Sequence, residues 1–341
     1  LAQKAFQHVA MYDTAIAQYL NEERFPKEMT VALKKACGLR YGENPHQEAA
    51  FYTEQDVKQK PSGLALLKRL SGPEISFNNL LDIDAALALL SNFTAPTVAI
   101  LKHSNSCGLA SHNNLAEAYR RALSGDPLAA FGGVVASNRT IDLATAEDIN
   151  KTHYDAIVAP GYKEEVMELL GRKKSLRLIK LPLAERSDGS RLDFRHVNGG
   201  LLAQTQDFFT ESESQPHTVT KRQPTEKELS DLPFAWKAVK GIKSNAIVIA
   251  KDKTLLGMGA GQPSRVVSVE LALERAGNRA KGSVLASDAF FPFADGPELA
   301  AKAGVTAIIQ SGGSIRDKEV IDVANQYNIA MVFTSVRHFR H

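Results

Sequence analysis

The sequence has almost no cysteine and no hydrophobic run long enough to cross a membrane. Its 341 residues include 2 cysteines, Cys37 and Cys107, which lie far apart and form no CxxC pair. This argues against a disulfide framework or a thiolate zinc site and fits a reducing cytoplasm. No apolar stretch approaches the roughly 20 residues of a membrane-spanning helix, and the first residues do not resemble a signal peptide. We therefore expect a cytoplasmic protein with no membrane partner.

A strong charge of either sign is also missing. The formal net charge is +3, and the 41 Lys and Arg residues are scattered among 38 Asp and Glu residues. No field able to hold a polyanion is expected, which argues against nucleic acid as the main partner. The content of 44% hydrophobic and 23% charged residues is that of a globular protein, and the length suits two packed domains.

The chain does not begin with methionine. Leu1 opens an amphipathic helical pattern that includes Phe6, Val9 and Tyr12. We expect from this that the chain is cut from a longer protein and that an amino-terminal partner is missing.

Strand and helix patterns alternate in two parts of the chain, which predicts two α/β units. A stretch rich in Ser, Asp, Gln and Thr, residues 181–230, lies between them and is the expected domain join. We predict helices at 1–37, 64–90, 115–123, 266–276 and 315–327, and strands at 97–101, 134–136, 246–250, 255–258, 284–286, 306–309 and 329–333.

The sequence also contains two patterns typical of helix starts and one pair of similar short segments. Thr225 with Glu228, and Ser314 with Asp317, have the spacing of capping boxes. No long repeat is visible, although VVASN at 134–138 and VLASD at 284–288 are similar strand ends. Five residues are too few to demonstrate a duplication.

Lys102 and His103 follow an apolar strand and precede a polar, Gly-containing segment. At the carboxyl end of a strand in an open α/β sheet, they are candidates for electrostatic stabilisation and proton transfer. The alternative is a solvated lysine and a histidine that caps a turn.

Four other segments leave similar alternatives open. Arg40 and Tyr41 lie in a Gly- and Pro-containing segment that suits a phosphate contact or a plain turn. The glycines before Arg265 suit an anion at a helix start, or a tight turn with a solvated arginine. The aromatic run SDAFFPFAD, 287–295, suits a wall for a flat heterocycle or core packing. The tail RHFRH, 337–341, suits a frayed end.

Taken together, these segments resemble one family. The motifs LRYGENPHQ, LKHSNSCG, KSNAIVIA, GAGQPSR, ASDAFFPFAD, IIQSGGSIRD and RHFRH occur in the order found in transformylases of aminoimidazole carboxamide ribonucleotide (AICAR). The resemblance runs nearly from end to end and points to the carboxyl-terminal part of a bifunctional purine-biosynthesis enzyme. It implies that the IMP cyclohydrolase domain of the same polypeptide is absent from these residues.

The resemblance also implies the architecture. It predicts two cytidine-deaminase-like α/β/α units joined by a linker, with an amino-terminal helical arm, and a homodimer with active sites at its interface. The expected boundaries are 1–37 for the arm, 38–180 for the first unit, 181–224 for the linker and 225–341 for the second unit. The zinc motifs HxE and PCxxC of deaminases do not occur, so no metal site is expected.

By the same resemblance, the chain transfers a formyl group from 10-formyltetrahydrofolate, as cosubstrate, to AICAR without a transition metal. It leaves open whether a structural monovalent cation is bound. The implied residues are, for catalysis, Lys102, His103 and Asn245; for AICAR, Arg40, Tyr41, Asp155, Arg265, Phe290 and Arg337; and for folate, Gly132, Phe293 and Asp295. Ser104 and Ser106 depart from the usual Ala and Pro, and Ser106 is expected to loosen the turn below His103. A non-catalytic nucleotide-binding module and a zinc-dependent deaminase are the alternative functions.

Overall fold

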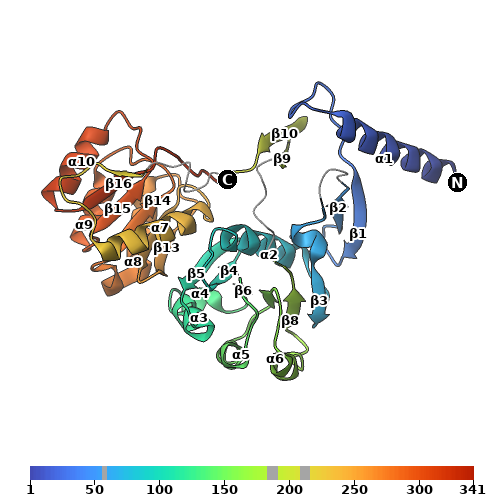
Figure 1. The fold of residues 1–341 in the computed structure, drawn as a ribbon, viewed down its shortest axis with the longest axis horizontal. Coiled ribbons are helices and arrows are strands. Elements are labelled where there is room, and N and C mark those ends of the chain that lie inside the picture. The colour runs from blue at the N-terminus through green and yellow to red at the C-terminus, as the bar shows by residue number, and fades with distance from the viewer. Residues whose placement is uncertain (56–59, 183–190, 208–215) are drawn as a thin grey trace.

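The computed structural model describes residues 1–55, 60–182, 191–207 and 216–341. At its centre is a 12-stranded mixed sheet with the strand order β11-β16-β15-β14-β12-β13-β5-β4-β6-β7-β8-β3 (Figure 1). Helices cover both faces of this sheet, which confirms the predicted α/β class. None of the helices within the described ranges is long and apolar enough to cross a membrane.

The first half of the sheet is built from the residues between the amino-terminal arm and the middle of the chain. Its elements are η1 (Gly63–Leu66), β3 (Lys68–Ser71), α2 (Phe77–Leu90), β4 (Thr97–Lys102), β5 (Asn105–Ser111), α3 (Leu115–Leu123), α4 (Pro127–Ala130), β6 (Val134–Ser137), α5 (Leu143–Asn150), β7 (Ala156–Ala159), α6 (Glu164–Leu170) and β8 (Arg177–Lys180).

The second half follows the same order of elements. They are β11 (His217–Thr218), α7 (Glu226–Lys240), β12 (Ile247–Lys251), β13 (Thr254–Gly259), α8 (Arg265–Ala276), η2 (Gly277–Ala280), β14 (Val284–Ser287), α9 (Asp295–Lys302), β15 (Ala307–Gln310), α10 (Asp317–Gln326) and β16 (Ala330–Phe333).

The two halves repeat one topology. The hairpin β4–β5 corresponds to β12–β13, and each hairpin has a register shift at the same place, after Ile100 and after Ile249. The first strand of each hairpin pairs antiparallel with β6 or β14, and two parallel pairings follow in each half. The halves join where β13 pairs antiparallel with β5. The similar segments at 134–138 and 284–288 therefore begin corresponding strands, β6 and β14.

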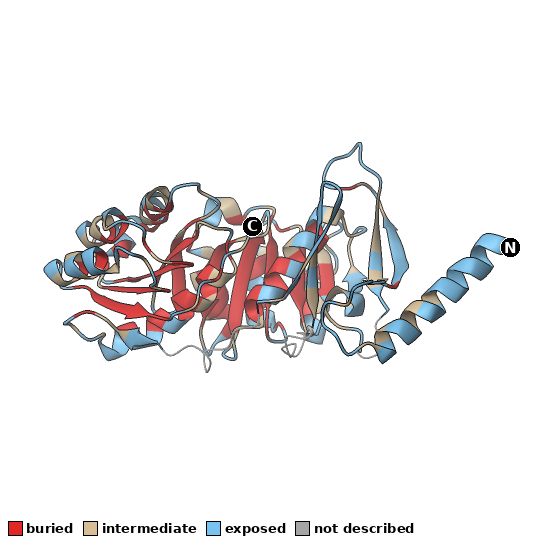
Figure 2. Cartoon of the chain, turned by 90° about the horizontal axis from the view of Figure 1, so that it is seen from above, coloured by how far each residue is buried: buried red, intermediate tan, exposed pale blue. Residues whose placement is uncertain are grey.

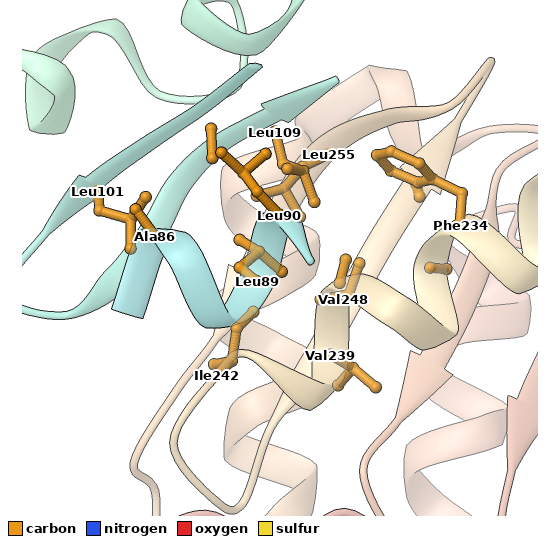
Figure 3. Close-up of a cluster of buried hydrophobic side chains, with 14 of the residues drawn as sticks. Ala86, Leu89, Leu90, Leu101, Leu109, Phe234, Val239, Ile242, Val248 and Leu255 are labelled. Carbon is orange, nitrogen blue, oxygen red and sulfur yellow. The ribbon is translucent and has the colours of Figure 1, made fainter. Parts of the chain in front are cut away.

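Three hydrophobic clusters hold the layers together, and the strands of the sheet are the most buried part of the chain (Figure 2). One face is covered by α2 and α7, whose side chains share a continuous cluster that includes Leu89, Leu90 and Val239 (Figure 3). On the other face, α3, α5 and α6 cover the first half, whereas α8, α9 and α10 cover the second. The sheet is thus the middle of three layers.

Glycines allow the hairpins to approach the helices closely. A Cβ atom on Gly108 would lie 2.2 Å from the carbonyl oxygen of Ala122 in α3, and one on Gly257 would lie 2.2 Å from that of Ala272 in α8. A Cβ atom on Gly259 would lie 2.0 Å from Ser268 O. Gly257 and Gly259 therefore serve strand–helix packing.

The amino-terminal arm is only partly helical. Helix α1 (Ala2–Leu20) is present as predicted, has no buried residue and extends away from the sheet (Figure 1). The predicted second helical run around Val31 and Leu33 is wrong, because β1 (Leu33–Leu39) pairs antiparallel with β2 (Ala49–Glu54). Likewise β3, inside the predicted helix 64–90, pairs with β8. In both places pairing with a distant segment overrides a local apolar pattern.

The expected domain join contains a hairpin, β9 (Leu192–Val197) with β10 (Gly200–Thr205). Residues 183–190 and 208–215 of the join lie outside the described residues. At its end the predicted capping box is confirmed, because Thr225 and Glu228 each bond the other's backbone N–H at the start of α7. The second predicted box is wrong, since α10 begins after Arg316 without a side-chain cap.

Glu228 links this cap to the rest of the second half and gives a stability prediction. Both of its carboxylate oxygens accept hydrogen bonds of 2.9 Å from Arg222. Burial alone would raise the pKa of Glu228, but the bonds to Arg222 and to the backbone of Thr225 lower it to about 2. A pKa below the usual 4.5 stabilises the fold above that pH, and this contribution disappears as the pH falls toward 2.

We therefore expect Glu228→Gln to lower the free energy of unfolding at pH 7 by about 2 kcal/mol, because Arg222 loses its buried partner. Urea unfolding at pH 7 and pH 3 measures this. The difference between the wild type and the variant should shrink at pH 3. An equal difference at both pH values would show that packing, and not charge, dominates.

Candidate functional site

Lys102 and His103 lie at the tip of the β4–β5 hairpin. The two loop residues, His103 and Ser104, have φ values of 52° and 60°, as in a type I′ turn. Ser104 N donates to Asp82 Oδ1 at 2.6 Å, which ties the turn to α2. His103 is exposed, so its imidazole is open to a ligand.

Lys102 is held by the segment before β6. Its Nζ donates to Phe131 O at 2.7 Å. In the second half the corresponding residue, Lys251, donates to Lys281 O at 3.0 Å. Each acceptor precedes a glycine with positive φ, Gly132 or Gly282. The bond from Lys102 is therefore a feature of the repeated fold, and it holds the amine beside the turn.

Two more of the predicted residues surround this pair. Gly132, with φ of 70°, follows the carbonyl that Lys102 contacts. Asp155 comes directly before β7, and its charge acts on Asp82. Burial, the largest cause, raises the pKa of Asp82, and the charge of Asp155 raises it further, whereas the N–H of Ser104 and the charge of His103 lower it. Asp82 thus interacts with the charge of His103 as well as with that of Asp155.

Tyr41 belongs to the same neighbourhood. Burial lowers the pKa of Arg177, while the charges of Asp155 and Tyr41 act to raise it. Arg40 lies with its guanidinium carbon 5.7 Å from the centre of the Tyr41 ring. We call the six predicted site residues of the first half the hairpin group: Lys102, His103, Gly132, Asp155, Arg40 and Tyr41.

Ser106 does not loosen the turn in the way that the sequence suggested. It is buried in β5, opposite Leu101, and its Oγ donates to Gly108 O at 2.9 Å. The register shift beside it is shared with the second half. The turn below His103 is thus closed by regular pairing, and the side chain of Ser106 has a partner.

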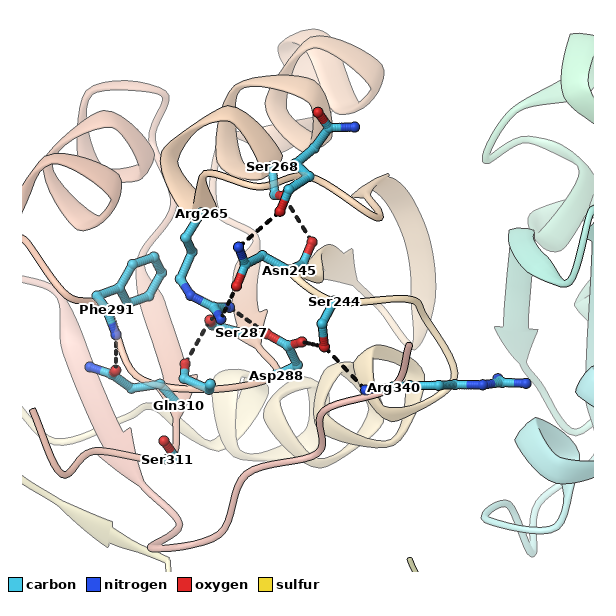
Figure 4. A network of polar contacts seen from close by, with 12 residues as sticks. Ser244, Asn245, Arg265, Ser268, Ser287, Asp288, Phe291, Gln310, Ser311 and Arg340 are labelled. Carbon is cyan, nitrogen blue, oxygen red and sulfur yellow. Dashed lines mark hydrogen bonds and ion pairs between the residues drawn. The ribbon is translucent and has the colours of Figure 1, made fainter. Parts of the chain in front are cut away.

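Asn245 and Arg265 form the centre of a polar network in the second half (Figure 4). Arg265 is buried, forms an ion pair with Asp288 and donates to Asn245 Oδ1 at 2.6 Å and to Ser287 Oγ at 2.8 Å. The alternative of a solvated Arg265 is therefore wrong. Asn245 Nδ2 donates to the carbonyls of Gln262 at 2.8 Å and Pro263 at 3.0 Å. Every polar group of the Asn245 side chain is engaged.

A cavity of about 350 Å³ opens beside this network. Its lining includes five predicted site residues, Asn245, Arg265, Phe290, Phe293 and Asp295. They come from the start of β12, the start of α8 and the segment after β14. We call these residues the cavity group.

The three phenylalanines of the aromatic run have different roles. Phe291 is fully buried in the core of the second half, where core packing is the correct alternative. Phe290 is half-buried, and Phe293 is 50% exposed with the guanidinium of Arg316 4.8 Å from its ring centre. Asp295 is exposed at the start of α9 and accepts a bond from Gly296 N at 2.7 Å. Phe290 and Phe293 thus remain available to a flat ligand.

The carboxyl-terminal tail is docked, so the frayed alternative is wrong. His338 is buried, its N donates to Asp288 O at 2.8 Å and its Nδ1 lies 2.6 Å from Asp207 Oδ2. Burial would raise the pKa of Asp207, but His338 and Lys240 hold it below its usual value. Arg337 is exposed, with its guanidinium carbon 4.8 Å from the ring centre of Phe339. Phe339 lines the cavity, which places Arg337 at its edge.

Both groups lie at one edge of the sheet. Strand β4 ends at Lys102, and the antiparallel β12 begins just after Asn245, so the two residues are at the same edge. Among the described residues no hydrogen bond or ion pair joins the hairpin group to the cavity group. In the first half this is the amino edge of the parallel strands, because β4 runs antiparallel to β6. Lys102 ends its own strand, but the prediction that this is the carboxyl edge of the parallel strands is wrong in the first half. The cavity group does lie at the carboxyl edge of the parallel strands of its half.

Sequence reasoning missed Asp82, Ser244, Ser287 and Asp288, which support these groups. Ser244 Oγ bonds Asp288, and Arg340 N donates to Ser244 Oγ at 3.1 Å. Ser287 is the last residue of the buried strand β14 and Asp288 directly follows it, and that position was the available signal. In the described part of the chain, no cluster of three or more His, Cys, Asp or Glu residues is arranged to hold a metal.

Comparisons with known proteins identify relatives over the whole chain. Residues 1–275 match the family model of the AICARFT/IMPCHase bienzyme. A bifunctional purine biosynthesis protein PurH from Caldicellulosiruptor saccharolyticus is 50% identical over 345 residues, which cover 100% of this chain and 67% of that protein. PurH proteins from Listeria monocytogenes and Bacillus cereus are each 49% identical with the same coverage. A solved structure of Acinetobacter baumannii RibD covers 29% of this chain and 32% of that one at 20% identity, with a TM-score of 0.23, which is too low to bear on the fold.

Proposed function

Since the chain belongs to the AICARFT/IMPCHase bienzyme family, a family of folate-dependent formyltransferases, we propose that it transfers the formyl group of 10-formyltetrahydrofolate to the 5-amino group of AICAR. The matched proteins are longer, and this chain spans about two thirds of their length. That the IMP cyclohydrolase domain lies outside these residues stays a prediction.

The fold part of the proposal is that each half of the sheet is a cytidine-deaminase-like unit. The repeated topology supports two units, with the arm at 1–37, the first unit at 38–180, the linker at 181–224 and the second unit at 225–341. The strand β1 crosses the first of these boundaries. We further propose a homodimer in which the hairpin group of one subunit faces the cavity group of the other.

The chemistry requires help for a weak nucleophile. The lone pair of the AICAR amine is drawn into the ring and its carboxamide, so a base must remove the proton as the new C–N bond forms. The bond between the formyl carbon and N10 of the folate then breaks, and N10 takes up a proton to give tetrahydrofolate. The exposed imidazole of His103 can act as this base, which contributes roughly 10²- to 10⁴-fold in rate. Lys102, held beside the turn, stabilises the negative charge that develops on the formyl oxygen.

Asn245 and Arg265 complete the proposed site from the cavity side. Both N–H groups of the Asn245 amide are donated to backbone carbonyls, so a direct contact with the formyl oxygen requires exchange of one of these bonds. Arg265 forms an ion pair with Asp288, and a nucleotide phosphate would compete with that carboxylate for the guanidinium. Phe290 would contact the AICAR carboxamide, while Phe293 and Asp295 would hold the pterin. Gly132 and Asp155 would line the clefts from the hairpin side.

The observation that carries the proposal is the placement of Lys102, His103 and Asn245 at one edge of the sheet in a chain of this family. Incubation of the protein with AICAR and 10-formyltetrahydrofolate, followed through the folate absorbance, tests it. Folate should be consumed only when AICAR is present. AICAR binding without folate consumption would favour a non-catalytic module, and ammonia release that a chelator abolishes would favour a zinc deaminase.

Arg337 gives a test of the nucleotide side. We expect Arg337→Ala to raise the AICAR dissociation constant by roughly 10- to 100-fold, because a charge-assisted bond to phosphate is worth about 1.5 to 3 kcal/mol. Calorimetric titration with AICAR and, separately, with folate measures the effect. Folate affinity should change much less. The control is Arg316→Ala, which removes the other guanidinium that stacks on a ring beside the cavity, Phe293. Equal weakening of both ligands by Arg337→Ala would remove the phosphate assignment.

A further inference from the structure

A carboxylate on the covering helix holds the hairpin turn in both halves of the molecule. In the second half, Asp231 of α7 accepts hydrogen bonds from Asp252 N at 2.9 Å and Lys253 N at 2.8 Å. In the first half, Asp82 of α2 accepts from Ser104 N at 2.6 Å. Both turns have two residues with positive φ and no glycine. Such backbone is strained in residues other than glycine, and bonds to a carboxylate offset part of this strain.

The two turns correspond residue by residue. Asp82 and Asp231 occupy the same position relative to the capping boxes that begin α2 at Ser76 and α7 at Thr225. In the sequence, the spacing from Asp82 to His103 equals that from Asp231 to Asp252. The turn and its carboxylate are therefore an architectural unit that the chain contains twice.

What differs is the residue at the first position of the turn. In the second half it is Asp252, which pairs with Lys227 on the surface at 3.1 Å. In the first half it is His103, and Asp82 is only half-buried beside it. We propose that Asp82 is a positioning residue for His103, which fixes the direction of the imidazole through the turn. This inference rests on the proposed role of His103 as the base.

The charged surroundings of Asp82 agree with this role. The titratable groups that act on it from neighbouring elements are His103 on the hairpin and Asp155 before β7, and Lys102 and Asp82 both act on Cys107 of β5. Burial raises the pKa of Asp82, while the bond from Ser104 and the charge of His103 lower it. The carboxylate therefore interacts with the histidine as well as with the backbone.

The repeat supplies a matched control for the test. We compare Asp82→Asn with Asp231→Asn in the full chain and measure thermal unfolding, kcat, both KM values and the pH dependence of kcat/KM. Asp82→Asn should lower kcat by about 10- to 50-fold with KM values within about twofold. Asp231→Asn should lower thermal stability and leave kcat and both KM values unchanged.

A double-mutant cycle separates this proposal from failure of the proposed base. If Asp82 acts through His103, Asp82→Asn should reduce the residual activity of His103→Ala by less than about twofold. Asp82→Glu keeps the carboxylate but places it on a longer side chain, so kcat should fall while both KM values stay close to those of the wild type. Two results would overturn the inference: a kcat of Asp82→Asn equal to that of the wild type, or an equal loss of activity in the presence and absence of His103. If kcat/KM of His103→Ala still falls at low pH as it does in the wild type, His103 is not the base, and the proposed function is contradicted instead.

Discussion

Lys102→Ala should lower turnover by roughly 10²- to 10³-fold or more while the AICAR dissociation constant changes little. The reason is that the ammonium group interacts most strongly with charge that develops on the formyl oxygen during the reaction, and hardly at all with the ground state. Steady-state kinetics with both substrates and calorimetric titration with AICAR measure the two quantities. The bond from Lys102 to Phe131 O supports a defined position for this amine.

Lys251→Ala is the matched control for this variant. Lys251 is the corresponding residue of the second half and makes the same kind of bond, to Lys281 O. Both variants lose one lysine-to-carbonyl bond at the end of a hairpin strand, so their losses of stability should be similar. Only Lys102→Ala should lose turnover. Near-wild-type turnover in Lys102→Ala, or an equal loss in both variants, would remove the proposed role.

The alternation of elements was predictable because buried strands and amphipathic helices leave local patterns. The strands β4, β6 and β12 to β16 and the helices α3, α8 and α10 lie close to their predicted positions. The strands β1, β3 and β5 were missed, because each is defined by its pairing partner. Strand β5 is a clear case. Its first residues, NSCG, have the composition of a polar loop, yet β5 pairs antiparallel with β4 directly after the two-residue turn.

The duplication was hidden for a related reason. The two halves share caps, turn geometry and buried apolar positions, and different residues meet most of these requirements. Identical residues, such as Gly108 and Gly257 at the helix contacts, are scattered. Asp252 and Lys253 adopt the same turn as His103 and Ser104 without sequence similarity. Only the strand ends at 134–138 and 284–288 kept enough identity to be noticed, because Ser137 and Ser287 make the same bond to the carbonyl two residues on.

For the candidate site, the types of residue could be predicted from the sequence, but their grouping in space could not. A lysine and a histidine at a strand end, and aromatic residues around a proline, stand out in a sequence. Their separation into a hairpin group and a cavity group depends on the strand order across the whole sheet. The burial of Arg265 against Asp288 depends on a contact between α8 and the end of β14.

This separation leads to a test with two inactive variants. The cavity is lined only by residues from Asn245 onward, so a site that also uses Lys102 and His103 must obtain them from across the sheet edge or from a second subunit. We propose the second subunit. Lys102→Ala and Asn245→Ala are each expected to be inactive as homodimers, since every site then lacks one group.

Co-expression with two different affinity tags and purification on both would give heterodimers of these two variants. One site then carries both substitutions and the other carries none, so activity per dimer should return to about half of the wild-type value. A heterodimer of Lys102→Ala with His103→Ala is the control and should stay inactive, because both substitutions affect the hairpin group and each site keeps one of them. If the site forms within a single chain, the first heterodimer will be as inactive as its parents, and the proposed shared site will be wrong.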